Sequence, residues 1–375
     1  MAAEKSHTLY SRLFYSFILT MIAAMAVSCH KSPIRETTVD PPDPINPASY
    51  RTGTFVINEG NFNWGNSSVT FKNDSDQLVS QDIFKAVNGR GLGDVAQSMR
   101  IFNKRGYIVV NNSNKIEVVS MTDFSSVKSI SGFNAPRYIE FIDSSKAYVS
   151  NLLRDISVVD LNTLTVTKSI RTSNWTEGLV KYKNLVFVTC IGNYNDPSSS
   201  RDAKILVIDT KSDEIIDSIQ TGVEPIGIVI DKKEKMWVLC SGGYDNFETP
   251  TLMRINPDIM AVEKVFTFSG TSVAPSRLCI NKGGDTIYFL RNGVYQMSVN
   301  AIAVPDQPVI PSGGRVLYGL GIDPKNGNIF VSDAVDYVQA GYVYQYNQVS
   351  ATQISKFEAG RIPGSFCFTD APVKK

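Results

Sequence analysis

A short apolar phrase that ends in a polar residue recurs along this chain and constrains its fold more than any other feature. The copies lie at residues 68–72, 116–120, 156–160, 205–209, 252–256, 294–298 and 343–347. Successive copies are roughly 40–50 residues apart, and each interval contains further short runs of strand-forming residues. A period of this length, filled with short strands, is typical of one blade of a β-propeller.

The third repeat shows the four strands of such a blade most clearly. Strand A is predicted at 138–142, strand B at 147–150, strand C at 156–160 and strand D at 164–170. Strand C is almost continuously apolar, as expected for a strand that is covered on both faces. Strand D alternates apolar and polar residues, as expected for a half-exposed edge strand. The sequence therefore predicts an all-β fold, a seven-bladed β-propeller with four-stranded blades.

The first and last segments of the propeller complement each other. The first repeat has candidates for strand B at 54–58, strand C at 68–72 and strand D near 77–84, but it lacks a strand A. Residues 364–368 have the pattern of a strand A without a blade of its own. We expect this C-terminal strand to join blade one and close the ring, because closure removes an unpaired sheet edge. The propeller then spans residues 51–370, followed by a tail at 371–375.

The N-terminal segment has the pattern of an export signal. Basic residues precede an apolar run at 13–27, which ends in small residues directly before Cys29. This pattern predicts a signal peptide at 1–28, and the Cys resembles that of a bacterial lipobox, where Cys29 would carry the lipid anchor. An ordinary secretory signal is the alternative. The Pro-rich residues 29–50 predict an extended tether. We expect a lipid-anchored protein that contacts the membrane through its anchor only.

Charge and cysteine content exclude some partners. The chain has 37 Lys and Arg residues against 36 Asp and Glu residues, so no field of one sign would attract nucleic acid. The cysteines lack the spacing of metal ligands. Cys190 and Cys240 end equivalent strands of neighbouring repeats, which are too far apart for disulfide geometry, so we expect buried thiols.

The loops of a propeller lie on two faces, and here the two sets differ in composition. The A–B turns are short and rich in Lys. The B–C and D–A loops, on the other face, carry aromatic residues among Asn, Gly and Arg, a composition typical of recognition surfaces. Packing of single aromatics between blades is the alternative, and Trp237, inside a predicted strand B, is expected in the core. The candidate ligand-binding residues are Trp64, Asn66, Arg137, Trp175, Tyr194, Tyr244, Phe247, Tyr318, Tyr337 and Arg361.

Catalysis is not the favoured interpretation. Both histidines, His7 and His30, precede the propeller, which excludes His-dependent nucleophile activation within it. Glycoside hydrolysis by two carboxylates is a further hypothesis that the sequence leaves open. Its candidates include Glu59 and Glu177, which we interpret as solvated loop acids. We therefore expect a binding protein that is not an enzyme and has no cofactor or metal.

The repeats over residues 55–362 resemble the YncE-like, YVTN-type seven-bladed propellers. The resemblance includes Ala-Tyr-Val-Ser-Asn at 147–151 and the run at 156–163. The opening Phe-Val-Ile-Asn-Glu-Gly at 55–60, followed by Asn-Ser-Ser-Val at 66–69, is similar to a group of Bacteroidetes lipoproteins. Some members, the BtuG-type proteins, bind cobalamin (vitamin B12) at the cell surface and deliver it to a TonB-dependent transporter. The resemblance implies an outer-membrane lipoprotein, at the cell surface rather than the periplasmic face, that captures cobalamin on the B–C/D–A face. A glycan-binding or protein-interaction propeller at the outer membrane is the alternative.

Overall fold

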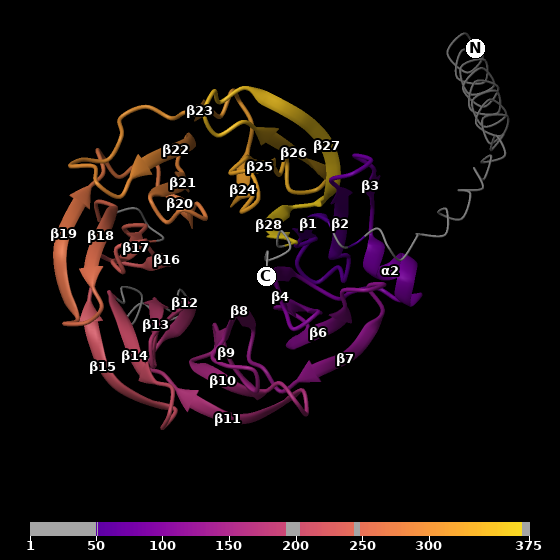
Figure 1. The fold of residues 1–375 in the computed structure, drawn as a ribbon, viewed down its shortest axis with the longest axis horizontal. Coiled ribbons are helices and arrows are strands. Elements are labelled where there is room, and N and C mark those ends of the chain that lie inside the picture. Colours follow the sequence, from indigo (N-terminus) through magenta and orange to yellow (C-terminus); the bar gives the residue numbers. More distant parts are fainter. Residues whose placement is uncertain (1–49, 51, 193–202, 244–247, 370–375) are drawn as a thin grey trace, which may run out of the picture. The chain divides into compact units, whose positions relative to one another are not determined.

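Seven four-stranded antiparallel sheets are arranged around a common axis (Figure 1). The structure, a computed structural model, describes residues 50, 52–192, 203–243 and 248–369. The predicted signal peptide, Cys29 and nearly all of the tether lie outside these residues. No helix in the described part of the chain has the length and hydropathy needed to span a bilayer. The predicted all-β, seven-bladed propeller is confirmed.

The strands of each blade are given from the axis outward. Blade one contains β28 (Pro363–Phe368), β1 (Gly53–Asn58), β2 (Ser68–Asn73) and β3 (Val79–Ser80). Blade two contains β4 (Ala96–Phe102), β5 (Arg105–Val110), β6 (Lys115–Ser120) and β7 (Ser126–Ser131). Blade three contains β8 (Pro136–Phe141), β9 (Lys146–Asn151), β10 (Asp155–Asp160) and β11 (Thr165–Arg171). Blade four contains β12 (Trp175–Tyr182), β13 (Leu185–Ile191), β14 (Lys204–Asp209) and β15 (Glu214–Gln220).

The remaining blades follow the same order. Blade five contains β16 (Pro225–Ile230), β17 (Met236–Cys240), β18 (Thr251–Asn256) and β19 (Ala261–Thr267). Blade six contains β20 (Ser276–Ile280), β21 (Thr286–Leu290), β22 (Gly293–Ser298) and β23 (Ile310–Pro311). Blade seven contains β24 (Leu317–Ile322), β25 (Ile329–Asp333), β26 (Ala340–Tyr346) and β27 (Gln353–Arg361).

The C-terminal strand closes the ring as the sequence predicted. Strand β28 pairs antiparallel with β1, and Thr54 lies opposite Phe368. One residue further on, the Gly53 amide donates to Thr369 Oγ1 at 2.8 Å, and the Thr369 amide donates to the Gly53 carbonyl at 3.1 Å. The innermost strands β28, β4, β8, β12, β16, β20 and β24 contact one another in succession around the axis.

Blade one departs from its prediction at the outer edge. A strand D was expected near 77–84, but β3 has only two residues and is followed by the helix α2 (Ile83–Asn88). Asp82 and Gly89, on either side of the helix, adopt left-handed conformations that turn the chain. Ile83 and Phe84 are fully buried in this arrangement. Burial of these two side chains explains why a short helix replaces the rest of the strand.

The hydrophobic core consists of layers between neighbouring blades. In β9, Ala147 and Val149 pack with side chains of blade two, whereas Tyr148 packs with Val186 and Val188 of blade four. Successive residues of a strand point to opposite faces, so a strand between two blades must be apolar on both. This is the reason for the nearly continuous apolar phrase in the sequence.

An aromatic cluster fills the layer between blades one and two. Tyr50, the last residue of the predicted tether, is buried there against Phe71 and Phe124, with ring centroids 5.1 and 5.5 Å away. Phe124 also stacks on Phe55, at 5.4 Å between centroids. These rings therefore join the start of the propeller to blade two.

The polar residue that ends each repeated phrase starts the turn between strands C and D. Its side-chain oxygen accepts a hydrogen bond from the backbone amide two residues later, as in the 2.7 Å contact from Asn162 to Asp160. In blade one the acceptor is Asn73, one residue beyond the predicted phrase. The acceptors in the other blades are Ser120, Asp160, Asp209, Asn256, Ser298 and Asn347.

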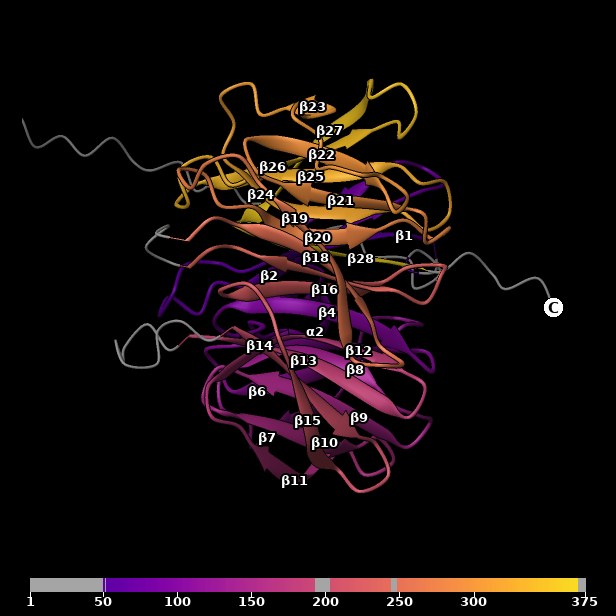
Figure 2. The same ribbon diagram turned by 90° about the vertical axis from the view of Figure 1, so that its left-hand side faces the viewer.

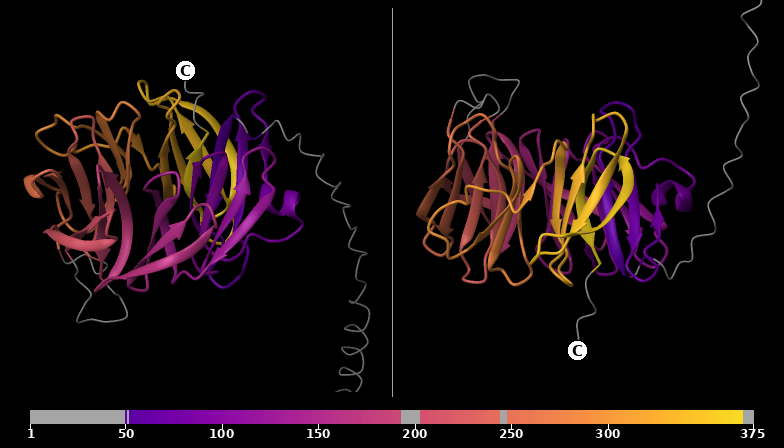
Figure 3. Two further views of the ribbon diagram at one scale, coloured as in Figure 1. Left: turned by 60° about the horizontal axis from the view of Figure 1, so that its bottom comes forward. Right: turned by 90° about the horizontal axis from the view of Figure 1, so that it is seen from above.

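The turns lie on two opposite faces of the propeller, as the edge-on views show (Figures 2 and 3). On the A–B/C–D face, turn lysines pair with acids of the next blade. Lys183 Nζ lies 2.6 Å from Asp258 Oδ1, and Lys325 contacts Asp74. The lysines predicted on this face therefore link blades as well as keeping the face hydrated. Exposed pairs of this kind add little stability one by one.

Candidate ligand-binding site

Each innermost strand contains a β-bulge near its start, on the B–C/D–A side. The pairing register with strand B shifts between Ala96 and Ser98 in β4, for example, and between Pro225 and Gly227 in β16. A bulge leaves a residue outside the ladder and redirects its side chain. We call the resulting set the bulge ring, in blade order Gly364, Gln97, Arg137, Glu177, Ile226, Arg277 and Tyr318.

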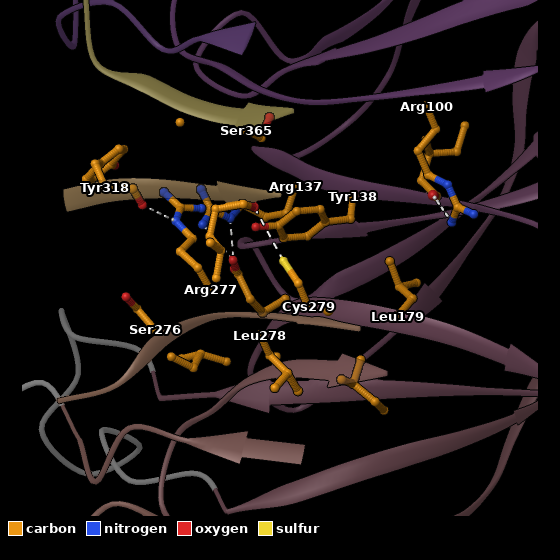
Figure 4. A pocket seen from close by; sticks show the side chains of 18 of the residues that line it. Arg100, Arg137, Tyr138, Leu179, Ser276, Arg277, Leu278, Cys279, Tyr318 and Ser365 are labelled. Atoms are coloured by element: carbon orange, nitrogen blue, oxygen red, sulfur yellow. Dashed lines mark hydrogen bonds and ion pairs between the residues drawn. The ribbon is translucent and has the colours of Figure 1, made fainter. Parts of the chain in front are cut away.

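A cavity of about 590 Å³ lies among the innermost strands, and we call it the channel (Figure 4). Residues from all seven innermost strands form its walls. Its lining includes the bulge-ring residues Arg137, Glu177, Ile226, Arg277, Tyr318 and Gly364. The bulges thus place polar and charged side chains at the end of the channel that opens on the B–C/D–A face.

Arg137 and Glu177 form an ion pair across blades three and four. The Nε and Nη2 groups of Arg137 donate to Glu177 Oε2 and Oε1 at 2.8 and 2.6 Å, and Nη1 donates to Gln97. Burial opposes the charge of Arg137, but Glu177 outweighs it and holds the pKa of the guanidinium above its usual value. Every nitrogen of this guanidinium therefore has an acceptor.

A second charged group joins blades six, seven and one. Glu59 follows β1, and its carboxylate accepts a 2.9 Å hydrogen bond from the Tyr318 hydroxyl. Arg277 Nη2 lies 3.5 Å from Glu59 Oε1. A Cβ atom on Gly364 would lie 2.4 Å from Glu59 Oε1, so only glycine leaves room for this carboxylate. Glu59 thus fills the bulge-ring position of blade one.

Beyond the bulge ring most of the channel lining is apolar, although Arg100 of β4 also lines it there. Ile139, Leu179, Ile228 and Leu320 line it there, together with Cys279. Cys279 Sγ donates to the Leu320 carbonyl at 3.3 Å, and burial raises the pKa of its thiol to about 12. A group that enters from the B–C/D–A face meets charged and hydrogen-bonding groups first and mainly apolar side chains after them.

The rim of the channel on this face has an exposed apolar patch. We call Phe62, Trp64, Tyr337 and Val338 the rim patch; their exposed fractions are 65%, 77%, 44% and 63%. The two loops that carry them are joined by a 2.6 Å hydrogen bond from Asn61 Nδ2 to the Tyr337 carbonyl. The Tyr337 ring also packs edge-on against Tyr318, with centroids 5.7 Å apart. Tyr337 therefore connects these two loops to the bulge ring.

The predicted site residues fall into three groups. Arg137, Tyr318 and Tyr337 line the channel, and Trp64 lies on the rim patch. Asn66, Trp175 and Arg361 lie on the same face but do not line the channel. Asn66 Oδ1 instead accepts the Asn61 amide at 2.8 Å, and Arg361 Nε donates to the Val338 carbonyl at 2.8 Å, so both support loops. Tyr194, Tyr244 and Phe247 lie outside the described residues.

Some channel residues were missed or misjudged in the sequence. Glu59 and Glu177 were predicted to be solvated, but their exposed fractions are 9% and 5%, because arginine and tyrosine partners hold them inside. Arg277 and Phe62 were expected in loops of the B–C/D–A face but were not among the ligand-binding candidates. Arg277 shares the bulge position of Arg137. An Ala-Pro pair lies directly before Arg137 and one residue further from Arg277, and this is the sequence signal that could have linked them.

The described residues include the four cysteines of the propeller. Cys190 and Cys240 are both buried thiols, as predicted. In the same part of the chain, no group of three or more His, Cys, Asp or Glu side chains is placed to hold a metal ion.

The chain is thus a seven-bladed β-propeller with a cavity among its innermost strands. The family model that matches residues 52–361 is described as a domain of unknown function, DUF5074. The match covers most of the sequence, so the chain belongs to this family. No curated protein matches the chain.

Solved structures with the same fold include proteins of varied function. A quinoprotein alcohol dehydrogenase-like protein from Bacteroides thetaiotaomicron is 14% identical, with a TM-score of 0.66 over 86% of this chain and 79% of that one. The periplasmic gluconolactonase of Pseudomonas aeruginosa is 9% identical, with a TM-score of 0.63 over 85% and 99%. Hydrazine synthase of Kuenenia stuttgartiensis is 15% identical, with a TM-score of 0.59 over 73% and 89%. At these identities the likeness shows the fold alone.

Proposed function

We propose that this protein captures a ligand at the B–C/D–A opening of the channel and does not transform it. The observation that carries the proposal is the joining of an exposed rim patch to a charged bulge ring. Trp64 and Tyr337 offer flat apolar contact area, and Tyr337 lines the channel together with Arg137 and Arg277. Aromatic area combined with a few directed polar groups is the usual composition of a small-molecule site.

A binding role suits the two channel carboxylates better than a catalytic one. Glu177 is held by two hydrogen bonds from Arg137, and Glu59 by the Tyr318 hydroxyl and Arg277. A general acid or base must exchange protons with a substrate. Carboxylates committed to protein partners in this way are poorly placed for such exchange.

We propose cobalamin as the ligand, and this step rests on the resemblance of residues 55–60 and 66–69 to BtuG-type lipoproteins. Cobalamin combines a broad ring system with amides and a phosphate. A ligand of that size would cover the rim patch and extend only one part of itself into a channel of about 590 Å³. The apolar rim patch matches the broad ring system of cobalamin, and the arginines of the channel match its phosphate.

The wider role that we propose rests on the N-terminal sequence and on the same resemblance. An anchor at Cys29 and the Pro-rich residues that follow would hold the propeller near an outer membrane, facing the cell exterior. In that position it would pass its ligand to a TonB-dependent transporter. A glycan is the second candidate ligand, because exposed aromatic rings such as Trp64 and Tyr337 also provide stacking surfaces for sugars.

Calorimetric titration tests the proposal directly. Cyanocobalamin and a set of defined oligosaccharides are titrated into the mature protein at micromolar concentration. We expect saturable binding of cyanocobalamin, weakened by about tenfold or more in Trp64→Ala, since aromatic truncation at a binding hot spot costs about 2 kcal/mol. Ile259→Ala, which removes an equally exposed apolar side chain from the opposite face, should bind like the unchanged protein.

Each outcome of the titration discriminates between the ligands. Absence of cyanocobalamin binding removes cobalamin from the proposal. Binding of an oligosaccharide that depends on Trp64 would then favour the glycan. Binding of neither would remove both, and equal effects of the two substitutions would place the site elsewhere.

A further inference from the structure

Two arginines occupy equivalent bulge positions in blades three and six, but their hydrogen bonds differ. Arg137 uses Nε, Nη1 and Nη2 on Glu177 and Gln97. Arg277 uses Nε on the Tyr318 carbonyl at 2.9 Å, and its Nη2 reaches Glu59 only at 3.5 Å. Its Nη1 has no acceptor within the part of the chain that the structure describes. Within the described residues, Arg277 therefore has N–H groups on Nη1 that are free to bind another group, whereas every guanidinium nitrogen of Arg137 already has an acceptor.

The unused N–H groups of Arg277 are available to a ligand in the channel, because the neighbouring residues that the structure describes offer them no further acceptor. Its side chain is 21% exposed and lines the cavity. In blade five the bulge-ring residue is Ile226, which offers no side-chain acceptor. Glu177 of blade four is already occupied by both branches of Arg137. The remaining nearby acid, Glu59, is shared with the Tyr318 hydroxyl.

We propose that Arg277 is the anchor for an oxyanion of the ligand, a phosphate or a carboxylate, at the top of the channel. A guanidinium has five donors in a planar fork that matches the two oxygens of such a group. The Arg277 guanidinium carbon lies 4.7 Å from the centroid of the Tyr318 ring, which holds the fork in place by stacking. An oxyanion that enters the channel takes the unused Nη1 and the weakly held Nη2 together.

Glu59 tunes this site because it competes for the same guanidinium. The bulge ring with Glu59 contains two arginines and two glutamates, so it has no net charge to attract anions in general. Selection therefore depends on geometry at Arg277 rather than on a positive field. Removing the charge of Glu59 should strengthen oxyanion binding, whereas removing Arg277 should weaken it. These opposite signs distinguish an anchor from an arginine that only supports the fold.

This inference rests on the proposed function for the location of the site, but not on cobalamin as the ligand. In cobalamin the oxyanion would be the phosphate. In another ligand it would be a phosphate ester or a carboxylate. The test uses inorganic phosphate and acetate as probes, because they separate the two kinds of oxyanion without assuming the rest of the ligand.

The experiment follows the arginine Nε–Hε resonances of the mature protein by NMR during titration with each probe. We expect phosphate, acetate or both to shift the Arg277 resonance with saturation. Arg277→Ala should lower the affinity by about tenfold or more, the equivalent of 1.4 kcal/mol. Arg277→Lys, which keeps the charge but loses the fork, should fall between. Glu59→Gln should raise the affinity several-fold and keep an acceptor for Tyr318.

Controls separate this proposal from loss of folding. Arg254→Ala removes an arginine that pairs with Glu263 away from the channel, and it should leave probe affinity unchanged. Melting curves show whether Arg277→Ala remains folded, and Glu59→Gln keeps the proposal testable if it does not. No saturable shift with either probe, or unchanged affinity in Glu59→Gln and Arg277→Lys, overturns the proposal.

The two proposals can fail independently. If phosphate or acetate binds in an Arg277-dependent way while cyanocobalamin does not bind, the oxyanion anchor stands and cobalamin falls. If cyanocobalamin binds equally well to Arg277→Lys, Glu59→Gln and the unchanged protein, cobalamin stands and the anchor falls.

Discussion

Single residues in this propeller acquire their roles from blades that are distant in sequence. Arg137 is fully hydrogen-bonded because Glu177 takes the bulge position of the next blade. Arg277 occupies the same position but faces Ile226 on one side, and it keeps unused donors. Equivalent positions in a repeat therefore support different chemistry, depending on the neighbouring blade.

Replacing Trp237 by Phe should destabilise the protein. Trp237 is fully buried, and its Nε1 donates to Asp231 Oδ2 at 2.8 Å. Phe removes the donor and leaves a buried carboxylate oxygen without it, which costs about 1–3 kcal/mol. Urea denaturation measures the change. Trp64→Phe, at a side chain that is 77% exposed, is the control and should stay within about 0.5 kcal/mol. Equal losses in the two variants would contradict the role given to the Asp231 contact.

The sequence predicted burial correctly for residues whose surroundings are set by nearby residues in the chain. It misled where the interaction partners lie far away in the sequence. Trp237 was predicted in the core because its own strand is apolar, and the structure confirms it. Glu59 was predicted to be solvated because its loop is polar. Its partners Tyr318 and Arg277 are more than 200 residues away in the chain, and no local pattern reveals them.

At the scale of elements, the turn between strands C and D explains why the repeat is visible in the sequence. A side-chain oxygen that accepts the amide two residues later is a purely local device, so each blade retains its own copy. The bulges in the innermost strands lack such a marker, because their positions depend on pairing with strand B. The strands were therefore predictable, but of the residues that the bulges turn toward the channel only Arg137 and Tyr318 were among the candidates.

Strand β28 should be required for folding, because it supplies strand A of blade one. A chain that ends at Ile362 would expose the inner edge of β1 and lose the paired contacts between Gly53 and Thr369. We expect aggregation or mixed oligomers in size-exclusion chromatography and a broadened thermal transition. A chain that ends at Thr369 retains β28 and is the matched control. A monomeric, cooperatively folding chain that ends at Ile362 would show that the closure is dispensable.

At the scale of the whole molecule, the ring is held by apolar layers between blades and by charged contacts on both faces. The layers follow from the continuous apolar phrases, which is why seven blades and their closure could be predicted from sequence. On the A–B/C–D face, pairs such as Lys183 with Asp258 link blade to blade. On the other face, the pairs surround the channel. Ion pairs thus connect the blades on the A–B/C–D face and surround the candidate binding site on the B–C/D–A face.

The buried acidic groups of the ring predict a loss of stability in alkaline solution. Burial raises the pKa of Cys240 and of Cys279 to about 12, and that of Tyr50 to about 12. In the unfolded chain, thiols ionise near pH 9 and phenols near pH 10. Above pH 9 the unfolded state therefore releases protons that the folded state retains, and the free energy of unfolding falls as the pH rises toward 12.

Urea denaturation at pH 7.5, 9 and 10.5, in the presence of a reductant, measures this loss. Between pH 9 and 10.5, Cys240 alone should contribute a fall of about 1–2 kcal/mol, since each pKa unit corresponds to about 1.4 kcal/mol. Cys240→Ala should be less stable at every pH because of the lost packing, but its decline between pH 9 and 10.5 should be shallower. Parallel curves for the two proteins would mean that the Cys240 thiol ionises in the folded state as readily as in the unfolded chain. A thiol buried between strands of blades four and five would not do so, and the shape of the pH curve therefore tests the packing between blades directly.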